Sequence, residues 1–310
     1  MGLERIVLVT RQTALQQLMQ RHSTSSQIKF YLESRGKSFQ DYQQAHDDYR
    51  KGLGVVMAAI SSTIPIQLVP KEMLATYSVS EKDAIVVVGD AGLLVNAAKY
   101  VGEQPIINVN PDQKRFDDVF TTCTPAEFPN VLQRTIDGKS GIEQLTMAEA
   151  ALEDGQRMYA LNDLFIGRRI HASARYWIEY EGSKENQSSS GVIVSTGTGS
   201  TGWLTSVMMG AHAIAGGDYL PQDAAFPRNS DYLVFTVREP FPSKITGTSI
   251  IHGKITREKP LKIFSNMPEE GVIFSDGVEQ DYLEFAAGKT ATIMPAEKKA
   301  QLVMALHRKQ

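Results

Sequence analysis

Short, uniformly apolar segments alternate with helical patterns through the first 135 or so residues of the chain. Strands that are apolar on both faces, and that are separated by helices, are typical of a parallel sheet covered on both sides. We therefore predict an N-terminal parallel α/β domain. The predicted strands are 6–10, 66–69, 84–88 and 105–109, and the predicted helices are 26–34, 39–61 and 93–101.

The pattern changes after Lys139-Ser140-Gly141, where short alternating strands separated by turn clusters become dominant. This spacing favours a C-terminal β-sandwich-like domain. We predict domains at 1–139 and 140–295, with 296–310 packing back on the first domain and 297–307 forming a helix. Residues 186–190 (NQSSS) are interpreted as a polar hairpin tip. The predicted strands are 158–166, 174–180, 191–196, 232–237, 261–264, 272–274 and 290–294.

Composition excludes several classes of function. The net charge of −3 and the pI near 6.1 argue against binding to nucleic acid or to an anionic membrane surface. The single cysteine, Cys123, is interpreted as a small interior or loop residue, and with the scattered histidines it shows no zinc-ligand spacing, so we expect no metal-ligating residues. No apolar run approaches the ~20 residues of a membrane span, and no signal-peptide pattern is present. We expect a cytoplasmic protein.

Residues 191–203, GVIVSTGTGSTGW, are the most informative motif. A short buried strand enters a loop of Gly, Ser and Thr, and a predicted helix follows. Such a loop lets backbone N–H groups approach a phosphate, and the helix N-terminus adds a positive dipole. The loop also matches G-x-G-x-x-G, but a dinucleotide-binding oxidoreductase needs a second strand ending in an acid about 20 residues on. Asp218 follows Ala215-Gly216-Gly217 instead of a strand, which disfavours that class; a purely structural glycine turn is the remaining alternative.

Three further features carry polar residues at places where a site could form. Gly89-Asp90-Ala91-Gly92 follows a predicted parallel strand, where ligands of open α/β sheets bind, although Asp90 would equally serve as a helix N-cap. Asn162-Asp163 interrupts an apolar strand, with exposure at a sheet edge as the alternative. Asp276-Gly277 has the sequence of a hairpin turn.

Taken together, these features resemble the NAD kinase family. Residues 196–203 resemble its T-x-T-G-S-T-A-Y segment, with Gly197, Gly202 and Trp203 in place of Pro, Ala and Tyr. Asn162-Asp163 resembles the family's Asn-Glu pair, Asp276-Gly277 falls where a late turn belongs, and 105–110 (PIINVN) resembles the strand after the GGDG loop. The resemblance covers about residues 84–295 and leaves the first 80 residues without a specific match.

The resemblance implies transfer of the ATP γ-phosphoryl group to the 2′-hydroxyl of NAD, giving NADP, with Mg²⁺ and with a homodimer or homotetramer as the assembly. The loop departs from GGDG. Aligned from the helix, Ala91 occupies the place of the catalytic aspartate and Asp90 is displaced by one; aligned from the strand, Asp90 is the aspartate. Asp90 is therefore the candidate base. The nucleotide-binding residues implied are Gly89, Ala91, Gly92, Asn162, Asp163, Thr196, Thr198, Gly199, Ser200, Thr201, Trp203, Asp276 and Gly277.

Two alternatives stay open at this point. The chain could be a nucleotide-binding relative with weakened or lost catalysis, because Ala91 stands at the aspartate position. It could also be a kinase of the same superfamily for another hydroxyl, such as that of a sugar or a lipid, although no basic amphipathic segment favours a lipid.

Overall fold

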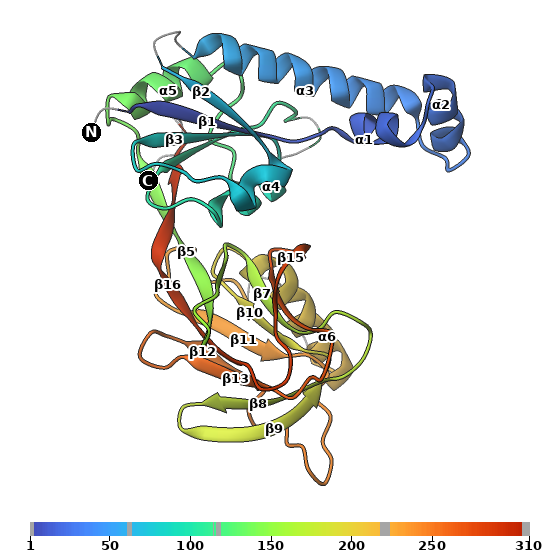
Figure 1. Ribbon diagram of the computed structural model, residues 1–310, viewed down its shortest axis with the longest axis vertical. Helices are drawn as coiled ribbons and strands as arrows, with labels where there is room; N and C mark the ends of the chain where they lie inside the picture. The colour runs from blue at the N-terminus through green and yellow to red at the C-terminus, as the bar shows by residue number, and fades with distance from the viewer. Residues whose placement is uncertain (1–2, 61–63, 114, 116–118, 218–223, 306–310) are drawn as a thin grey trace. The chain divides into compact units, whose positions relative to one another are not determined.

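The computed structural model describes residues 3–60, 64–113, 115, 119–217 and 224–305. The chain forms two compact units (Figure 1). Unit 1 comprises Met1–Glu143 with Gln301–Gln310, and unit 2 comprises Gln144–Ala300. The predicted fold class, an N-terminal parallel α/β region followed by an antiparallel β region, is confirmed.

The sheet of unit 1 has the strand order β2-β1-β3-β4, with every pair parallel, and Gln301 and Leu302 at the end of β16 add to β4 in parallel. From β1 the chain continues to β2 on one side of the sheet, and from β3 it continues to β4 on the other side. The strand order therefore reverses between β1 and β3, which is where open α/β sheets bind ligands. The strands are β1 (Arg5–Thr10), β2 (Ile66–Pro70), β3 (Asp83–Val88) and β4 (Pro105–Val109).

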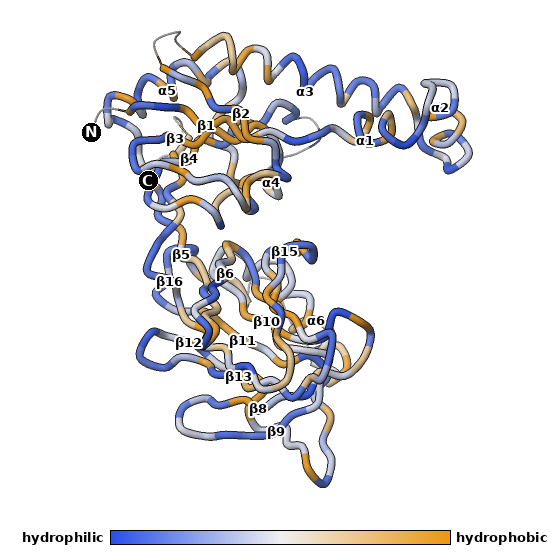
Figure 2. The backbone as a smooth tube through the Cα atoms, viewed as in Figure 1, coloured by the Kyte–Doolittle hydropathy of each residue, from blue (hydrophilic) through white to orange (hydrophobic). Residues whose placement is uncertain are grey.

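Apolar composition explains why the central strands form. All six residues of β3 are buried, and Figure 2 shows β1, β3 and β4 in the hydrophobic colour and much of α3 in the hydrophilic colour. Helices α1 and α2 lie against one end of the long helix α3, around a small core of Leu15, Ile28 and Leu32 (Figure 1). The helices are α1 (Ala14–Arg21), α2 (Ser25–Glu33), α3 (Phe39–Ala59), η1 (Lys71–Thr76), α4 (Ala91–Ala98) and α5 (Phe128–Ile136).

An ion pair joins β1 and β3 at their N-terminal ends. Arg5 donates to both carboxylate oxygens of Asp83, at 3.0 and 2.7 Å, and Asp83 is buried. Removing one partner of such a pair leaves a buried charge without its counterion, and this cost exceeds the net value of the pair.

We expect Arg5→Gln to lower the free energy of unfolding by about 2 kcal/mol, less than for a fully buried pair because Arg5 is partly exposed. Urea denaturation of the two proteins would measure it. A change below about 0.5 kcal/mol would mean that Ser80 N–H, which also donates to Asp83, is enough to satisfy the carboxylate.

Unit 2 is built from two antiparallel sheets that share one core. One has the order β12-β11-β10-β7-β14-β15; in the other, β16, β13, β8 and β9 lie side by side and β5 pairs with β6 and β16. Buried residues of both sheets, such as Tyr176 and Ile263 on one and Val194 and Phe235 on the other, belong to a single cluster, as in a sandwich. The strands are β5 (Ile142–Leu152), β6 (Arg157–Ala160), β7 (Asp163–Arg168), β8 (Ala174–Tyr180), β9 (Ser183–Ser189), β10 (Val192–Ser195), β11 (Leu233–Val237), β12 (His252–Ile255), β13 (Leu261–Ser265), β14 (Gly271–Ser275), β15 (Val278–Glu284) and β16 (Thr290–Val303).

Three local predictions were wrong. The segment 297–307 is not a helix: up to Val303 it continues β16, because pairing with neighbouring strands overrides the helical propensity of Glu, Lys and Ala; residue 307 lies outside the described residues. Residues 186–189 are not a hairpin tip but part of β9, which pairs with β8 along its whole length. The segment 158–166 is two strands, β6 and β7, separated at Leu161-Asn162.

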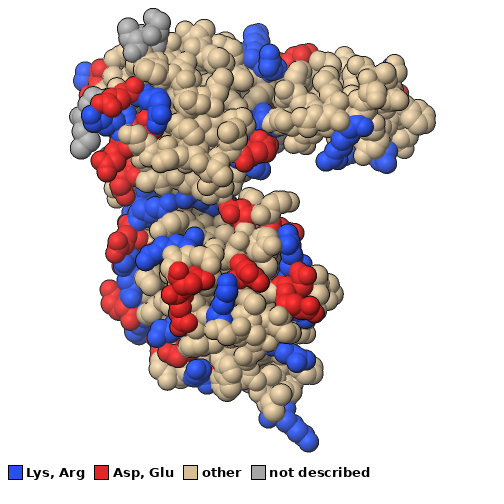
Figure 3. Space-filling model, viewed as in Figure 1, with Lys and Arg blue, Asp and Glu red and all other residues tan. Residues whose placement is uncertain are grey.

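In the part of the chain that the structure describes, no helix is both long and apolar enough to cross a membrane. Positive and negative side chains are interspersed on the face drawn in Figure 3. Cys123 is buried, as predicted, and burial raises the pKa of its thiol to about 12, so it is not a nucleophile at neutral pH.

Candidate functional site

A cavity of about 340 Å³ lies in unit 1 at the carboxyl ends of its parallel strands; we call it the strand-end cavity. Its walls come from the segments that directly follow β1, β3 and β4, and from helices α1 and α3. The lining includes Arg11, Ala45, Tyr49, Asp90, Asp112 and Arg115. Gly89 and Asp90, two of the predicted site residues, therefore line a cavity where the strand order reverses.

Asp90 is held by two contacts. It is the N-cap of α4: its Oδ1 accepts from Leu93 N–H at 3.1 Å, while Oδ2 lies 3.3 Å from Nε of Arg11. The N-cap interpretation of Asp90 is thus confirmed, and Ala91 is the first residue of the helix. Gly92 is exposed in the same turn.

Arg11 is positioned by α3. Its backbone N–H donates to the Tyr49 hydroxyl at 3.0 Å, and its guanidinium carbon lies 5.3 Å from the centre of the Tyr49 ring. Tyr49 is buried, and burial raises the pKa of its phenol, so it stays a neutral platform.

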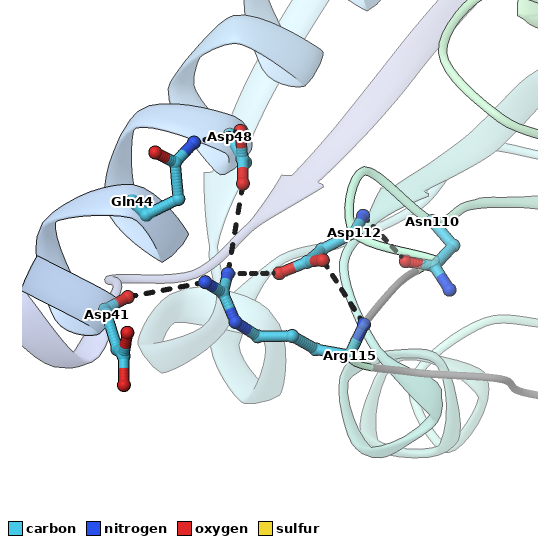
Figure 4. Close-up of polar contacts among 6 residues, drawn as sticks. All are labelled: Asp41, Gln44, Asp48, Asn110, Asp112 and Arg115. Carbon is cyan, nitrogen blue, oxygen red and sulfur yellow. Dashed lines mark hydrogen bonds and ion pairs between the residues drawn. The ribbon is translucent and has the colours of Figure 1, made fainter.

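A second arginine fastens the segment after β4 to α3 (Figure 4). Arg115 donates to Asp112 Oδ2 at 2.6 Å and to the backbone oxygen of Asp41 at 3.5 Å, and lies 3.8 Å from Asp48 Oδ2. Asp112 N–H in turn donates to Asn110 Oδ1 at 2.9 Å. One wall of the strand-end cavity is therefore held by charge pairing between a helix and a loop.

Three of the predicted segments come together in unit 2. The Asp276 carboxylate accepts from the backbone N–H groups of Leu161, Asn162 and Asp163 at 3.1, 2.7 and 3.2 Å. The N–H of Asp276 donates to Asp163 O at 2.9 Å. Asp276 and Gly277 both have positive φ, in the turn between β14 and β15, so the hairpin interpretation is confirmed. The Asp276 carboxylate therefore fixes the backbone at Leu161-Asn162, where β6 ends and β7 begins.

The Gly/Ser/Thr loop joins the same cluster. Thr196 is fully buried; its hydroxyl donates to Leu161 O and accepts from the N–H groups of Thr198 and Gly199 at 3.1 and 3.2 Å. A Cβ on Gly199 would lie 2.3 Å from Asn162 O, so only glycine allows this approach. Three segments separated by about 35 and 80 residues in the sequence thus form one structure.

The loop differs from the predicted phosphate cradle. The N–H groups of Thr198 and Gly199 are bonded to Thr196, and the Ser200 hydroxyl is buried and donates to Gly197 O. The following helix starts later than predicted: one wide turn, η2 (Ser200–Leu204), precedes α6 (Thr205–Ala215). Thr201 is exposed and Thr198 Oγ1 is buried without a hydrogen bond in the described structure. Asp218 lies outside the described residues.

Trp203 packs within its own unit. Its ring stacks on Phe165 with ring centres 5.8 Å apart, and the guanidinium of Arg238 lies 5.4 Å from the ring centre. Ser190 donates its N–H to Arg238 O, which places the Arg238 backbone beside the segment between β9 and β10. The surroundings of Trp203 are therefore aromatic and cationic.

The Asp163 carboxylate is buried, and its pKa is shifted as a result. Burial raises its pKa to about 7; a hydrogen bond from Ser195 lowers it and the nearby Asp276 raises it. Its Oδ1 is buried and, within the described structure, has no hydrogen-bond partner. A carboxylate at this position pays a desolvation cost whenever it is charged.

This cost predicts how stability depends on pH. The folded-state pKa is above the ordinary value, so the folded state binds the proton more tightly. The contribution of Asp163 to stability is therefore fully present below about pH 4 and is lost as the pH rises to about 7. Asp163→Asn should remove that fall and be the more stable protein at pH 8, by on the order of 3 kcal/mol.

Urea denaturation at pH 5, 6, 7 and 8 would compare the two proteins, and subtracting the curves cancels all other titrating groups. Parallel curves for wild type and Asp163→Asn would contradict the burial of charge at this residue.

The sequence did not point to Arg11, Tyr49, Asp112 or Arg115. One signal was available for the first: Arg11 and Asp90 follow directly after two apolar strands, and charged residues at the carboxyl ends of neighbouring parallel strands meet at one edge. No signal linked Tyr49 to that edge, because the contact depends on how α3 packs.

Comparisons with known proteins find NAD kinases among the sequence relatives of the chain. No family model matches the chain. It is 25% identical over 252 residues to human mitochondrial NAD kinase 2, covering 64% of this chain and 57% of that protein, and 26% identical over 228 residues to NAD kinase of Chlorobaculum tepidum, covering 71% of each. The chain thus spans less than two thirds of the human relative's length.

Solved structures share the fold. The yeast NADH kinase structure, a complex with NADH, matches with a TM-score of 0.58 and 14% identity over 98% of this chain and 84% of that one. An Archaeoglobus fulgidus NAD kinase in complex with ATP matches with a TM-score of 0.55 and 17% identity, over 97% and 94%. The chain is therefore related in sequence to the NAD kinases and has their fold.

Proposed function

We propose that the chain is a NAD kinase-like phosphotransferase that transfers the ATP γ-phosphoryl group to the 2′-hydroxyl of NAD. The observation that carries the proposal is Asp90, a carboxylate lining the strand-end cavity at the point where the strand order reverses. Phosphoryl transfer needs a group that takes the hydroxyl proton, together with donors around the phosphates. The names of the sequence relatives, NAD kinases, support the same activity.

The unit 2 cluster is proposed to hold nucleotide groups. Asn162 and Asp163 would contact ribose or adenine, as the resemblance implies; within the described residues, the buried Oδ1 of Asp163 has no hydrogen-bond partner. Thr198 and Thr201 would supply hydroxyls, and Trp203 an aromatic edge. Thr196 and Asp276 would act indirectly, by holding these residues in place through their backbone contacts.

Magnesium fits the residues of the strand-end cavity. Among the described residues no three His, Cys, Asp or Glu side chains are grouped to hold a metal ion. Nucleotide-bound Mg²⁺ needs only one or two carboxylates besides the phosphates, and Asp90 and Asp112 line the same cavity. Asp112 would hold the ion, leaving Asp90 to act as the base, and the ion would offset phosphate charge when bound.

A second candidate, nucleotide binding without catalysis, is favoured by one observation. Asp90 is engaged both as a helix cap and as the partner of Arg11, and Ala91 stands where one alignment places the aspartate. Transfer to another hydroxyl, such as that of a sugar, is the third outcome that the experiment separates.

Incubation of the protein with NAD, ATP and Mg²⁺, followed by an enzymatic assay for NADP, tests the proposal. NADP formation supports it. ATP and NAD binding by calorimetry without NADP formation would favour the noncatalytic relative, and ATP binding without NAD binding would favour another acceptor. NADH run in parallel would show which oxidation state is preferred.

Domain roles, assembly and location are further proposals. We propose that 1–139 is an α/β domain carrying the Gly89–Gly92 loop and that 140–295 is a nucleotide-binding domain. We also propose a homodimer or homotetramer, as the resemblance implies, and a cytoplasmic location. Light scattering after gel filtration would measure the assembly. Cell fractionation would distinguish the cytoplasm from the mitochondrial location that one relative's name carries.

A further inference from the structure

Among the described residues of unit 1, Arg5, Arg11 and Arg115 pair with carboxylates, and they differ in how many hydrogen bonds their guanidinium groups make. Arg5 makes two hydrogen bonds to Asp83, and Arg115 is held by Asp112, Asp48 and Asp41. Arg11 has a single ion pair, with Asp90, and one long hydrogen bond of 3.4 Å to Gln12 O. Its Nε is buried and makes no hydrogen bond in the part of the chain that the structure describes.

The position of Arg11 is nevertheless fixed. Tyr49 accepts from its backbone N–H and lies beneath its guanidinium, so the side chain is held in the strand-end cavity before any ligand arrives. A preorganised cation with unused donors loses little entropy when it binds an anion. Its planar group matches phosphate oxygens in two-point contacts.

We propose that Arg11 is the anion-binding residue of the strand-end cavity and takes a phosphate group of the nucleotide in exchange for the Asp90 carboxylate. The ligand class is a polyphosphate. Gly89 lies beside Arg11 in the cavity wall: a Cβ there would lie 2.9 Å from a Leu93 methyl carbon and 3.6 Å from Arg11 Nε, so glycine keeps the space next to Arg11 Nε free of a side chain.

The exchange has a consequence for Asp90 that rests on the proposed function. Oδ1 stays bonded to Leu93 N–H, whereas Oδ2 loses Arg11 and becomes available. Oδ2 then takes the proton of the acceptor hydroxyl as its oxygen bonds to the γ-phosphorus, and the bond from that phosphorus to the bridging oxygen breaks, releasing ADP. Donor binding would thus free the base.

Arg11→Gln tests the proposal, with Arg5→Gln as the matched control: both arginines pair with an aspartate across β1 and β3, at opposite ends of the strands. Calorimetric titration with inorganic tripolyphosphate should show affinity about 10- to 100-fold weaker for Arg11→Gln and unchanged for Arg5→Gln. Equal affinity of Arg11→Gln and wild type, an equal loss in both variants, or no binding to wild type would overturn it.

A second pair leaves Arg11 intact in case Arg11→Gln does not fold. Ala45 lines the cavity, whereas Ala58, on the same helix, is exposed and outside it. Ala45→Leu should weaken ATP binding at least 10-fold and Ala58→Leu should not. Unchanged ATP binding by Ala45→Leu would place the polyphosphate elsewhere and overturn the proposal.

These results are separable from the proposed function. Tripolyphosphate binding that depends on Arg11, without NADP formation, would keep the anion site and overturn the kinase proposal. NADP formation by the wild type, with unaltered tripolyphosphate binding by Arg11→Gln, would support the kinase proposal and overturn the anion site.

Discussion

Replacing Asp90 with asparagine is expected to lower kcat for NADP formation by about 10²- to 10⁴-fold, the usual cost of losing a general base. The change is nearly isosteric. Asparagine caps helices as well as aspartate does, so the bond to Leu93 N–H and the start of α4 should survive. The melting temperature of Asp90→Asn should therefore stay close to that of the wild type, while kcat falls.

Steady-state kinetics at saturating ATP and NAD, with melting temperatures in parallel, would measure this. A wild-type rate in Asp90→Asn would show that Asp90 is not the base. If Asp90→Asn has lost activity, adding Ala91→Asp to it discriminates between the two alignments. Recovery of activity would place the catalytic position at Ala91, the first residue of α4 and one residue after the cap.

Replacing Gly197 with alanine is expected to destabilise unit 2 by about 3 kcal/mol or more. An added Cβ would lie 2.0 Å from Pro227 O and 2.6 Å from Pro227 C, and both of these atoms belong to backbone that cannot rotate away. Gly197→Pro, which restores the residue that the resembled family segment carries, should do the same. The loop around Pro227 has packed into the space that a side chain would occupy.

Gly202→Ala is the matched control, because it also restores a family residue in the same segment but meets no atom within 4 Å. Its free energy of unfolding in urea should stay within about 0.5 kcal/mol of wild type. If Gly197→Ala were equally mild, the segment around Pro227 would have to move by more than an ångström at no measurable cost.

The strands of unit 1 were predictable because their residues are almost all apolar, as is typical of strands buried on both faces. The segment 84–88 is apolar at every position, which is typical of a strand in a sheet covered on both faces. Helices 26–34 and 39–61 were also recognised, since their polar faces follow the helical period. Helix α1 was missed despite its capping box at Thr13.

Polar strands were the main source of error in unit 2. Residues 186–189 lack apolar side chains, but Gln187 is buried because its amide donates to Ile250 O and Glu185, and it accepts from Tyr176. Hydrogen bonds to distant partners replace burial of apolar surface there, and a local pattern cannot show them. The strand after Glu297 was also missed because its pairing with distant strands cannot be seen in a local sequence pattern.

The candidate site was predictable only in part. The Asn162, Thr196 and Asp276 segments were found as motifs, and the structure brings them together. Apart from Gly89 and Asp90, the walls of the strand-end cavity were not found, because Tyr49 and Arg115 gain their roles from the packing of α3 against the segments after β1 and β4.

The last strand has a consequence for how the chain must be made. Leu302 and Val303 are buried in unit 1, and Val303 O accepts from Thr122 at 2.8 Å, although more than 150 residues of unit 2 intervene in the sequence. During synthesis β4 therefore remains an open edge until unit 2 has left the ribosome. An unpaired edge invites pairing with other nascent chains, so slow translation through unit 2 lengthens the period in which unit 1 is vulnerable to aggregation.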